Sequence, residues 1–251
     1  MKIINVGSGS SGNSTLIYDG KTLLMIDAGL ALTRVKNCLE TLGKGPSDIL
    51  ALLLTHGHID HVKHQDKFKD EIRFGPEDIV SNKQNALKPY VIYRFGTFEV
   101  TPVKLSHDVT CFGYILFSNY TKEKVVYITD TGFIPEKTLE LSNDADYYIF
   151  ESNHDTTMEM KSNRPIYLIK RNISSTGHLN NYDSSYYLSC LVGEKTKAIM
   201  FAHISRDCNT VEHIKSAYEE VFIAQRGKVM ENIEVYYLKQ DEPTYIRELV
   251  K

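Results

Sequence analysis

The sequence has few cysteines, and they are far apart. Cys38, Cys111, Cys190 and Cys208 form no Cys-x-x-Cys pair among the 251 residues. This spacing is typical of reduced, mostly buried thiols in a cytosolic protein. A chain of this length can also bury a full hydrophobic core without help from disulfides.

The sequence also lacks a clustered basic segment. Lysine and arginine are scattered, and the formal net charge is −3. This argues weakly against a long nucleic-acid groove, because such a groove needs a positive surface to neutralise phosphates. It leaves open a local basic pocket, and bound metal cations would add positive charge of their own.

Long apolar runs and long linkers are absent as well. No apolar run approaches membrane-spanning length, and residues 1–7 lack the longer apolar region of a signal peptide. We therefore expect a cytoplasmic protein without membrane contact. No repeat, low-complexity tract or Pro/Gly/Ser linker is long enough to separate domains, so we expect one domain over residues 1–251.

Short runs rich in β-branched, aromatic and leucine residues are frequent. They predict strands at 3–6, 15–18, 23–27, 49–55, 90–95, 98–105, 113–117, 125–130, 147–151, 198–202 and 233–238. Gly96-Thr97 predicts a hairpin. Helices are expected at 32–42, 135–141, 182–191 and 214–224, the last with Thr210 near its N-terminus. This mixture predicts an α/β fold with two sheets and helices outside.

The densest chemical signal is Thr-His-Gly-His-Ile-Asp-His at residues 55–61, directly after an apolar run. Imidazole and carboxylate together are the ligands of a zinc-type site, and this segment offers more of them than one metal needs. His56 and His58 can point the same way from an extended segment. Asp60 and His61 follow where the chain turns toward a helix, so they can face a second metal.

Two metals need further ligands, which we expect immediately after other apolar strands. His107, Asp130 and His203 each follow such a run. The donors then divide into two sets that share one bridging carboxylate: His56, His58 and His107 on one metal, Asp60, His61 and His203 on the other, and Asp130 between them. Each metal keeps a position for water, as catalytic sites do. Metals about 3.5–4 Å apart lower the pKa of such a water and clamp an in-line displacement.

These motifs together resemble the metallo-β-lactamase fold superfamily, from Gly7 to about Thr210. The sequence is similar to the branch that contains YycJ/WalJ-type exonucleases. The similarity lies in the Gly/Ser loop at 7–14 and in several short motifs: Asp27-Ala28-Gly29, Leu105-Ser106-His107-Asp108, Thr129-Asp130-Thr131-Gly132, Glu151-Ser152-Asn153-His154-Asp155, Gly177-His178-Leu179 and Ala202-His203-Ile204-Ser205. The resemblance implies a four-layer αββα sandwich with mixed sheets and a dinuclear zinc or manganese centre. It also implies a homodimer.

The branch is also similar to tRNase Z-type phosphodiesterases. That similarity implies that Glu151 and His178 assist proton transfer to the leaving oxygen, while a turn histidine is the alternative for His178. Asp27 is expected to orient the histidine ligands by hydrogen bonds. Ser106 and His154 are expected beside the ligands or in the substrate pocket, although His154 could do neither.

The reaction follows from these roles. Asp60, ligated through one oxygen, can orient the attacking water, and acid catalysis by the Glu151–His178 pair suits the alkoxide leaving group of a phosphodiester. The sequence therefore predicts a metal-dependent hydrolase, specifically a dinuclear phosphodiesterase. Histidine-rich ligands favour zinc, and a carboxylate bridge also accepts manganese.

The substrate is the least constrained part. The compact, acidic chain is similar to phage anti-Pycsar phosphodiesterases, which implies cyclic mononucleotides (cCMP or cUMP, with cAMP and cGMP as further candidates) and evasion of cyclic-nucleotide immune signalling. The alternative is a 5′-to-3′ exonuclease of YycJ/WalJ type on single-stranded DNA. A metal-free scaffold and a carbonyl hydrolase are two further alternatives, which the full ligand set and the Glu151–His178 pair disfavour.

Overall fold

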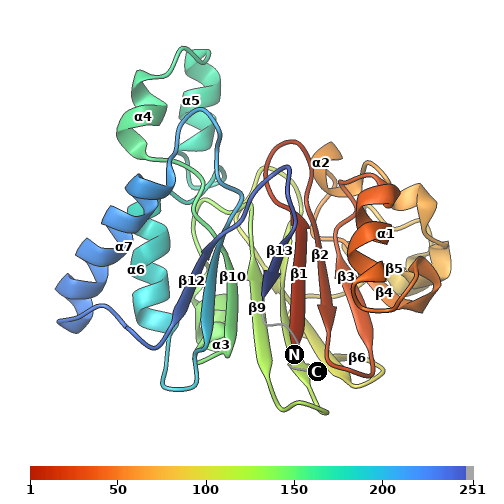
Figure 1. The fold of residues 1–251 in the computed structure, drawn as a ribbon. Coiled ribbons are helices and arrows are strands. Elements are labelled where there is room, and N and C mark those ends of the chain that lie inside the picture. The colour runs from red at the N-terminus through yellow and green to blue at the C-terminus, as the bar shows by residue number, and fades with distance from the viewer. Residues whose placement is uncertain (247–251) are drawn as a thin grey trace. The chain divides into compact units, whose positions relative to one another are not determined.

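A computed structural model describes residues 1–246 of the chain. The chain divides into two compact units of α/β structure (Figure 1). Unit 1 comprises residues 1–103, 109–123 and the segment from 238 onward. Unit 2 comprises residues 104–108 and 124–237. The predicted ligands fall in both units.

Unit 1 contains a six-stranded mixed sheet in the order β13-β1-β2-β3-β4-β5. Its strands are β1 (Lys2–Gly7), β2 (Ser14–Tyr18), β3 (Leu23–Ile26), β4 (Ile49–Leu53), β5 (Arg73–Phe74) and β13 (Thr244–Ile246). β13, β1, β2 and β3 pair antiparallel, whereas β3, β4 and β5 pair parallel. β3 is buried along its whole length, as expected of a continuous apolar strand covered on both faces.

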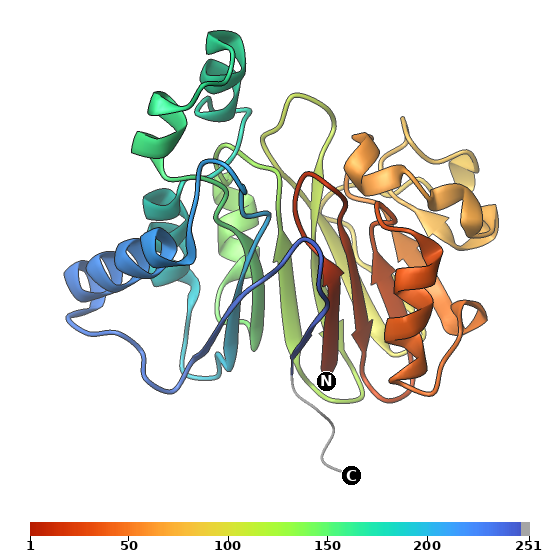
Figure 2. The same ribbon diagram turned by 45° about the horizontal axis from the view of Figure 1, so that its top comes forward.

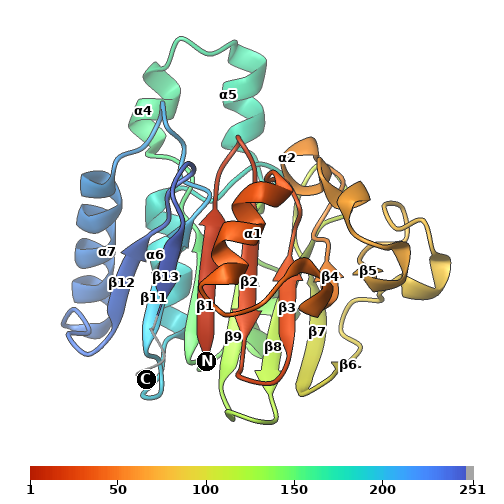
Figure 3. The ribbon, with the colours of Figure 1, turned by 45° about the vertical axis from the view of Figure 1, so that its right-hand side comes forward.

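Helix α1 (Leu32–Glu40) covers the β1 region of this sheet (Figure 3). Its buried side chains Val35, Cys38 and Leu39 follow helical spacing and join the core of unit 1. Unit 1 also holds α2 (Ile59–Val62), β8 (Phe112–Ser118) and an antiparallel pair of β6 (Tyr93–Phe95) with β7 (Phe98–Lys104). Gly96 turns between β6 and β7 with a φ of 56°, which confirms the predicted hairpin.

Unit 2 is built on four parallel strands in the order β12-β11-β10-β9. They are β9 (Lys124–Ile128), β10 (Tyr147–Glu151), β11 (Ala198–Ala202) and β12 (Glu234–Tyr237), and the connecting helices are α3 (Glu136–Ser142), α4 (Thr156–Lys161), α5 (Ile166–Asn172), α6 (Asn181–Leu191) and α7 (Val211–Arg226). Parallel strands need such crossovers, and they bring their carboxyl ends to one edge of the sheet. Figure 2 shows α4 and α5 projecting beyond α6 and α7.

Several predicted strands are shorter in the structure, and the backbone explains why. Asp27 and Asp130 have φ angles of 59° and 60°, so the predicted strands 23–27 and 125–130 stop before them. Tyr90, with a φ of 66°, likewise lies outside β6. The predicted strand 49–55 ends at Leu53, and the amide of Thr55 donates to Asp27 instead of a neighbouring strand.

The helix expected at Asp60 and His61 is α2, whereas helices α4 and α5 and strands β5 and β13 were not predicted. Each is short: α4 has 6 residues and α5 has 7, too few to display a helical repeat of apolar residues. Within residues 1–246, no helix combines the length and apolar character that crossing a membrane requires.

Candidate metal centre

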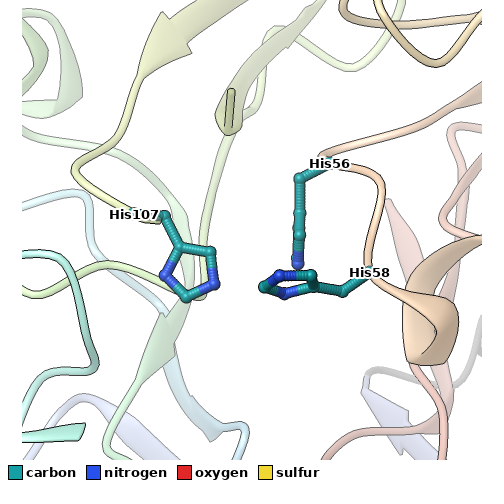
Figure 4. A group of neighbouring side chains, drawn as sticks. All are labelled: His56, His58 and His107. Carbon is teal, nitrogen blue, oxygen red and sulfur yellow. The ribbon is translucent and has the colours of Figure 1, made fainter. Parts of the chain in front are cut away.

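In unit 1, three histidines of the 55–61 segment gather at the end of β4. The ring of His56 lies 4.7 Å from that of His58 and 4.1 Å from that of His61, between centroids. His56 and His61 are buried, and His58 is half-buried. Figure 4 shows the His56 and His58 rings on the loop that joins β4 to α2. A buried strand followed at once by a short helix thus concentrates three imidazoles.

Asp27 orients this histidine cluster. It is fully buried, its Oδ2 lies 2.7 Å from Nδ1 of His61, and its Oδ1 accepts the amide of Thr55 at 2.8 Å. The Thr55 hydroxyl lies within 3.0 Å of both carboxylate oxygens. Burial raises the pKa of Asp27, and His61 and Thr55 oppose that effect. A carboxylate on Nδ1 is the contact that orients a metal-binding histidine to use Nε2, which agrees with the role predicted for Asp27.

Asp60 and His61 rest on the loop at 7–14. The side-chain amide of Asn13 is 3.2 Å from Oδ2 of Asp60 and 2.9 Å from Nε2 of His61. The backbone amide of Asn13 also donates to the backbone carbonyl of Asp60 at 2.8 Å. A Cβ at Gly29 would lie 1.7 Å from that same carbonyl oxygen, so only glycine fits there. Close packing against the Asp60 backbone therefore explains the glycine of the Asp27-Ala28-Gly29 motif.

In unit 2, polar side chains meet where parallel strands end. Glu151 closes β10, Asp130 follows β9 by two residues, and His203 follows β11. His178 joins them from the loop between α5 and α6. Ligand atoms of these four residues all lie within 4.8 Å of one another. Oδ1 of Asp130 is 3.5 Å from Nε2 of His203 and 3.8 Å from Nδ1 of His178.

Glu151 is the hub of this set. Its Oε1 lies 2.8 Å from Nδ1 of His178 and 3.0 Å from Nδ1 of His203. Its Oε2 accepts the amides of Thr131 and Leu179 at 3.0 and 3.1 Å. Burial acts to raise the pKa of Glu151, but the charge of His178 and the hydrogen bonds of His178 and His203 outweigh it and lower the pKa to about 2. A charged carboxylate thus holds both imidazoles by Nδ1.

His107 belongs to the same unit and is buried. Its Nδ1 donates to the carbonyl of Gly177 at 3.1 Å, and its ring lies 5.4 Å from that of His178. Burial lowers the pKa of His107, which favours the neutral imidazole that metals bind. Figure 4 shows this ring on the loop that follows β7.

Three of these strand-end residues share an unusual backbone. Asp27, Asp130 and His203 have φ angles of 59°, 60° and 53°. A non-glycine residue in the left-handed region costs about 1–3 kcal/mol and is held only where its surroundings enforce it. Such residues cluster at functional sites, which agrees with the role that the sequence predicts for all three.

The other predicted site residues are placed as follows. Ser106 ties its loop to the Asp130 loop, because its amide donates to Thr131 Oγ1 at 3.0 Å and its carbonyl accepts the amide of Gly132. His154 is buried and lies outside the four-residue set, and its carbonyl accepts the amide of Asn181. The ligand sets predicted for each metal have members in both units, so that division stays a prediction.

Sequence reasoning missed residues that hold the histidines. The sequence assigns Asn13 only to the Gly/Ser loop at 7–14 and Thr55 only to the start of the 55–61 motif. Asn153 was quoted in a motif without a role, yet its side chain donates to the His203 carbonyl at 2.8 Å. A polar residue directly beside a ligand motif was the only available signal for Thr55. For Asn13 and Asn153 the contact depends on loop geometry.

The donor atoms fit divalent metals of the zinc type. Unit 1 offers three imidazoles and the Asp60 carboxylate, and unit 2 offers imidazoles with Asp130. Imidazole nitrogen and carboxylate oxygen are ligands that zinc accepts and that manganese shares in part. The Nδ1 contacts of His61 and His203 to carboxylates are the outer contacts typical of metal-bound histidine.

Comparison with known proteins agrees with this chemistry. Residues 7–77 match the family described as "Metallo-beta-lactamase superfamily". The crystal structure of the metallo-β-lactamase fold protein YhfI from Bacillus subtilis matches with a TM-score of 0.72, at 18% identity, over 97% of this chain and 98% of that one. Residues 7–77 thus resemble this superfamily, and the chain as a whole has the metallo-β-lactamase fold. The predicted fold class is confirmed, and this fold implies divalent metal ions.

Curated relatives align over most of the chain. The chain is 27% identical to "Exodeoxyribonuclease WalJ" of Streptococcus pneumoniae serotype 2, over 82% of each chain. It is 26% identical to "Exodeoxyribonuclease YycJ" of Bacillus anthracis, over 96% of this chain and 97% of that one. The resemblance to the YycJ/WalJ branch is thereby confirmed.

Proposed function

We propose that this protein is a metal-dependent phosphodiesterase that shortens single-stranded DNA from an end. The observation that carries the proposal is the Glu151–His178 pair within the four-residue set of unit 2. The superfamily domain and relatives named exodeoxyribonuclease support a metal-dependent hydrolase of the nuclease and phosphodiesterase class. Neither relative's name refers to a cyclic nucleotide, so the comparisons support the exonuclease alternative and leave the cyclic-mononucleotide preference a prediction.

The metals would be held by the predicted ligands His56, His58, Asp60, His61, His107, Asp130 and His203. When bound, they would supply Lewis acidity toward a phosphate and lower the pKa of an attacking water. Asp27 keeps His61 in the tautomer that presents Nε2, and Glu151 does the same for His203. Asp60, with its carboxylate against Asn13, orients the attacking water.

His178 would act on the leaving oxygen. Glu151 fixes its Nδ1 at 2.8 Å, which leaves Nε2 to hold a proton and release it to an alkoxide. A phosphodiester of a sugar hydroxyl needs such a proton, because an alkoxide is a poor leaving group. The buried Glu151 carboxylate would orient the His178 ring and stabilise its protonated form, as the carboxylate of a catalytic triad does for its histidine.

The test is a substrate panel with the purified full chain and added zinc or manganese. End-labelled single-stranded DNA, cyclic CMP, cyclic UMP and cyclic AMP are incubated in parallel. Progressive shortening of the DNA is expected, with the cyclic nucleotides unchanged. Asp130→Ala should abolish the shortening, while Asp19→Asn, which alters a carboxylate outside the donor sets, should keep it. Linear monophosphates from cyclic substrates with intact DNA would contradict the proposal.

Several predictions from the sequence are left as proposals. The homodimer, the cytoplasmic location, a role in phage evasion of immune signalling and the choice of zinc over manganese belong to this group. Size-exclusion chromatography with light scattering measures the first, and elemental analysis of protein purified without added metal measures the last.

A further inference from the structure

Helices α4 and α5 with their linker, residues 156–173, form what we call the α4–α5 arm. The arm carries four basic residues, Lys161, Arg164, Lys170 and Arg171, and one acidic residue, Glu159, in a chain whose net charge is −3. Figure 2 shows the arm projecting from the helices of unit 2. Its charge is therefore opposite in sign to that of the chain as a whole.

The single acid of the arm is used inside it. Glu159 is fully buried, accepts from Nη1 of Arg164 at 2.9 Å and accepts from the side-chain amide of Asn172 at 2.8 Å. Arg164 also donates to Ser205 and to Asp207 in the loop after β11. These bonds brace α4 against α5. Of the basic residues of the arm, Lys161 and Lys170 are exposed, whereas Arg164 and Arg171 are half-buried.

The arm also exposes large apolar surface. Tyr167 is 72% exposed, Ile166 is 66% exposed and Met160 is 64% exposed. Exposing large apolar side chains to water is unfavourable, and a surface on which several are exposed often marks an interaction site. Lys170 follows Tyr167 by three residues on α5, so the two side chains share one helix face. An exposed aromatic ring with a lysine beside it suits a single nucleic-acid strand, because bases stack on the ring and phosphates pair with the ammonium group.

The end of the arm adjoins the candidate site within unit 2. The amide of His178 donates to the Asn172 carbonyl at 2.9 Å, and Arg171 pairs with Asp108, the neighbour of His107. A Cβ at Gly177 would lie 2.1 Å from the Arg171 carbonyl, so the loop to His178 is folded tightly against α5. A strand lying on the arm would therefore be led toward His178.

We infer that the α4–α5 arm is a contact surface for single-stranded nucleic acid, with Tyr167 stacking on a base and Lys161 and Lys170 contacting phosphates. This rests on the proposed nuclease function and names where that function takes up its polymer. A local basic surface of this kind also reconciles the acidic net charge of the chain with a polyanionic substrate.

The experiment measures binding and hydrolysis separately. Fluorescence anisotropy of a labelled 20-nucleotide single strand is recorded with the full chain in EDTA, so that cleavage is absent, across a series of salt concentrations. Variants are Tyr167→Ala and the double variant Lys161→Ala/Lys170→Ala. Matched controls are Tyr186→Ala, an exposed tyrosine on α6, and Lys215→Ala/Lys228→Ala, two exposed lysines at α7. Metal-loaded hydrolysis of bis(p-nitrophenyl) phosphate reports the active site alone.

Tyr167→Ala is expected to weaken binding about tenfold with little change in salt dependence. The double lysine variant should lower the slope of log affinity against log salt by about 1.4, since each phosphate contact on a single strand contributes about 0.7. Controls should bind like the wild type, and all variants should hydrolyse the small phosphodiester normally.

Wild-type affinity in both arm variants of a protein that degrades DNA would overturn the arm assignment and leave the proposed function standing. A wild type that neither binds nor shortens DNA would overturn both. Loss of binding to phosphatidylglycerol vesicles by Tyr167→Ala, with DNA affinity unchanged, would assign the arm to a lipid surface and overturn the nucleic-acid assignment.

Discussion

Nδ1 of His61 lies 2.7 Å from Oδ2 of Asp27, and both side chains are fully buried. The carboxylate orients the ring through Nδ1, and Nε2 faces the side chains of Asn13 and Asp60. In the proposed centre Nε2 would bind the metal in place of its contact with Asn13. The same relationship recurs in unit 2 between Glu151 and His203. Both units therefore present histidines that a buried carboxylate holds by Nδ1.

Asp27→Asn should weaken metal binding. Asparagine has a similar size and tolerates the φ of 59° at this position, but it lacks the charge that holds His61. Removing such an outer contact is expected to lower metal affinity about 10–100-fold. Competition with a chromogenic chelator measures the affinity.

Asp19→Asn is the matched control for that variant. Asp19 is also buried in unit 1, but it bonds to Thr97 and Ser118 rather than to a histidine. The control should bind metal like the wild type and melt at a lower temperature. Equal metal affinity in both variants and the wild type would show that Asp27 does not support metal binding through His61.

Glu151→Gln should slow turnover about 10–100-fold. The substitution keeps the shape of the side chain but removes the charge that orients His178 and His203. The kcat for bis(p-nitrophenyl) phosphate measures the effect, with metal content determined in parallel. Asp146→Asn, another buried carboxylate of unit 2, should leave kcat unchanged. A kcat of Glu151→Gln within twofold of the wild-type value would show that the charge of Glu151 is not needed for turnover.

His178→Ala should keep its metal and lose activity selectively. General acid catalysis contributes about 10²–10⁴-fold where the leaving group needs a proton. DNA shortening should fall by that factor, whereas hydrolysis of bis(p-nitrophenyl) phosphate, whose leaving group departs as a stable anion, should fall far less. Equal losses on the two substrates would argue for a binding role instead of proton donation.

Glu159→Gln should destabilise the protein at neutral pH and not at low pH. Burial acts to raise the pKa of Glu159, but bonds from Cys208 and Asn172 and the charge of Arg164 lower it below the model-compound value of 4.5. A carboxyl with a lowered folded pKa stabilises above pH 4.5, and the stabilisation is lost as pH falls toward the folded pKa. Urea unfolding should show a deficit of about 1–3 kcal/mol at pH 7.

That deficit should shrink as pH falls from 4.5 toward the lowered pKa of folded Glu159, because the unfolded chain takes up the proton first. A difference between the variant and the wild type that stays constant from pH 7 down to the acid limit of the folded state would contradict the assignment of a charged, buried Glu159. The same curves would then indicate that packing rather than charge braces α4 against α5.

The sequence alone was sufficient to locate the candidate site residues that directly follow apolar runs. His56, His58 and His61 lie within one short segment, and Asp130 and His203 stand at strand ends, where parallel topology gathers side chains. Glu151 and His178 were paired by family resemblance, and the structure places them 2.8 Å apart. The strand boundaries near Asp27 and Asp130 were wrong, because positive φ angles have no signature in aspartate.

Other features depend on loop geometry and were beyond the sequence. Asn13 reaches His61 only because the loop at 7–14 folds back onto the 58–61 turn. Helices α4 and α5 are too short to show periodicity, so the arm and its exposed Tyr167 were not predicted. The scattered lysines and arginines of the sequence do not indicate this surface, because total charge does not reveal that the one acid of the arm is buried.

The most direct measurement is the metal content of the purified full chain and of Asp130→Ala, by elemental analysis after dialysis against zinc and then against metal-free buffer. Two zinc ions per wild-type chain are expected, with at most one in Asp130→Ala, because the proposed centre uses the Asp130 carboxylate as a ligand of both metals. Two ions in both proteins, or none in the wild type, would contradict the dinuclear centre.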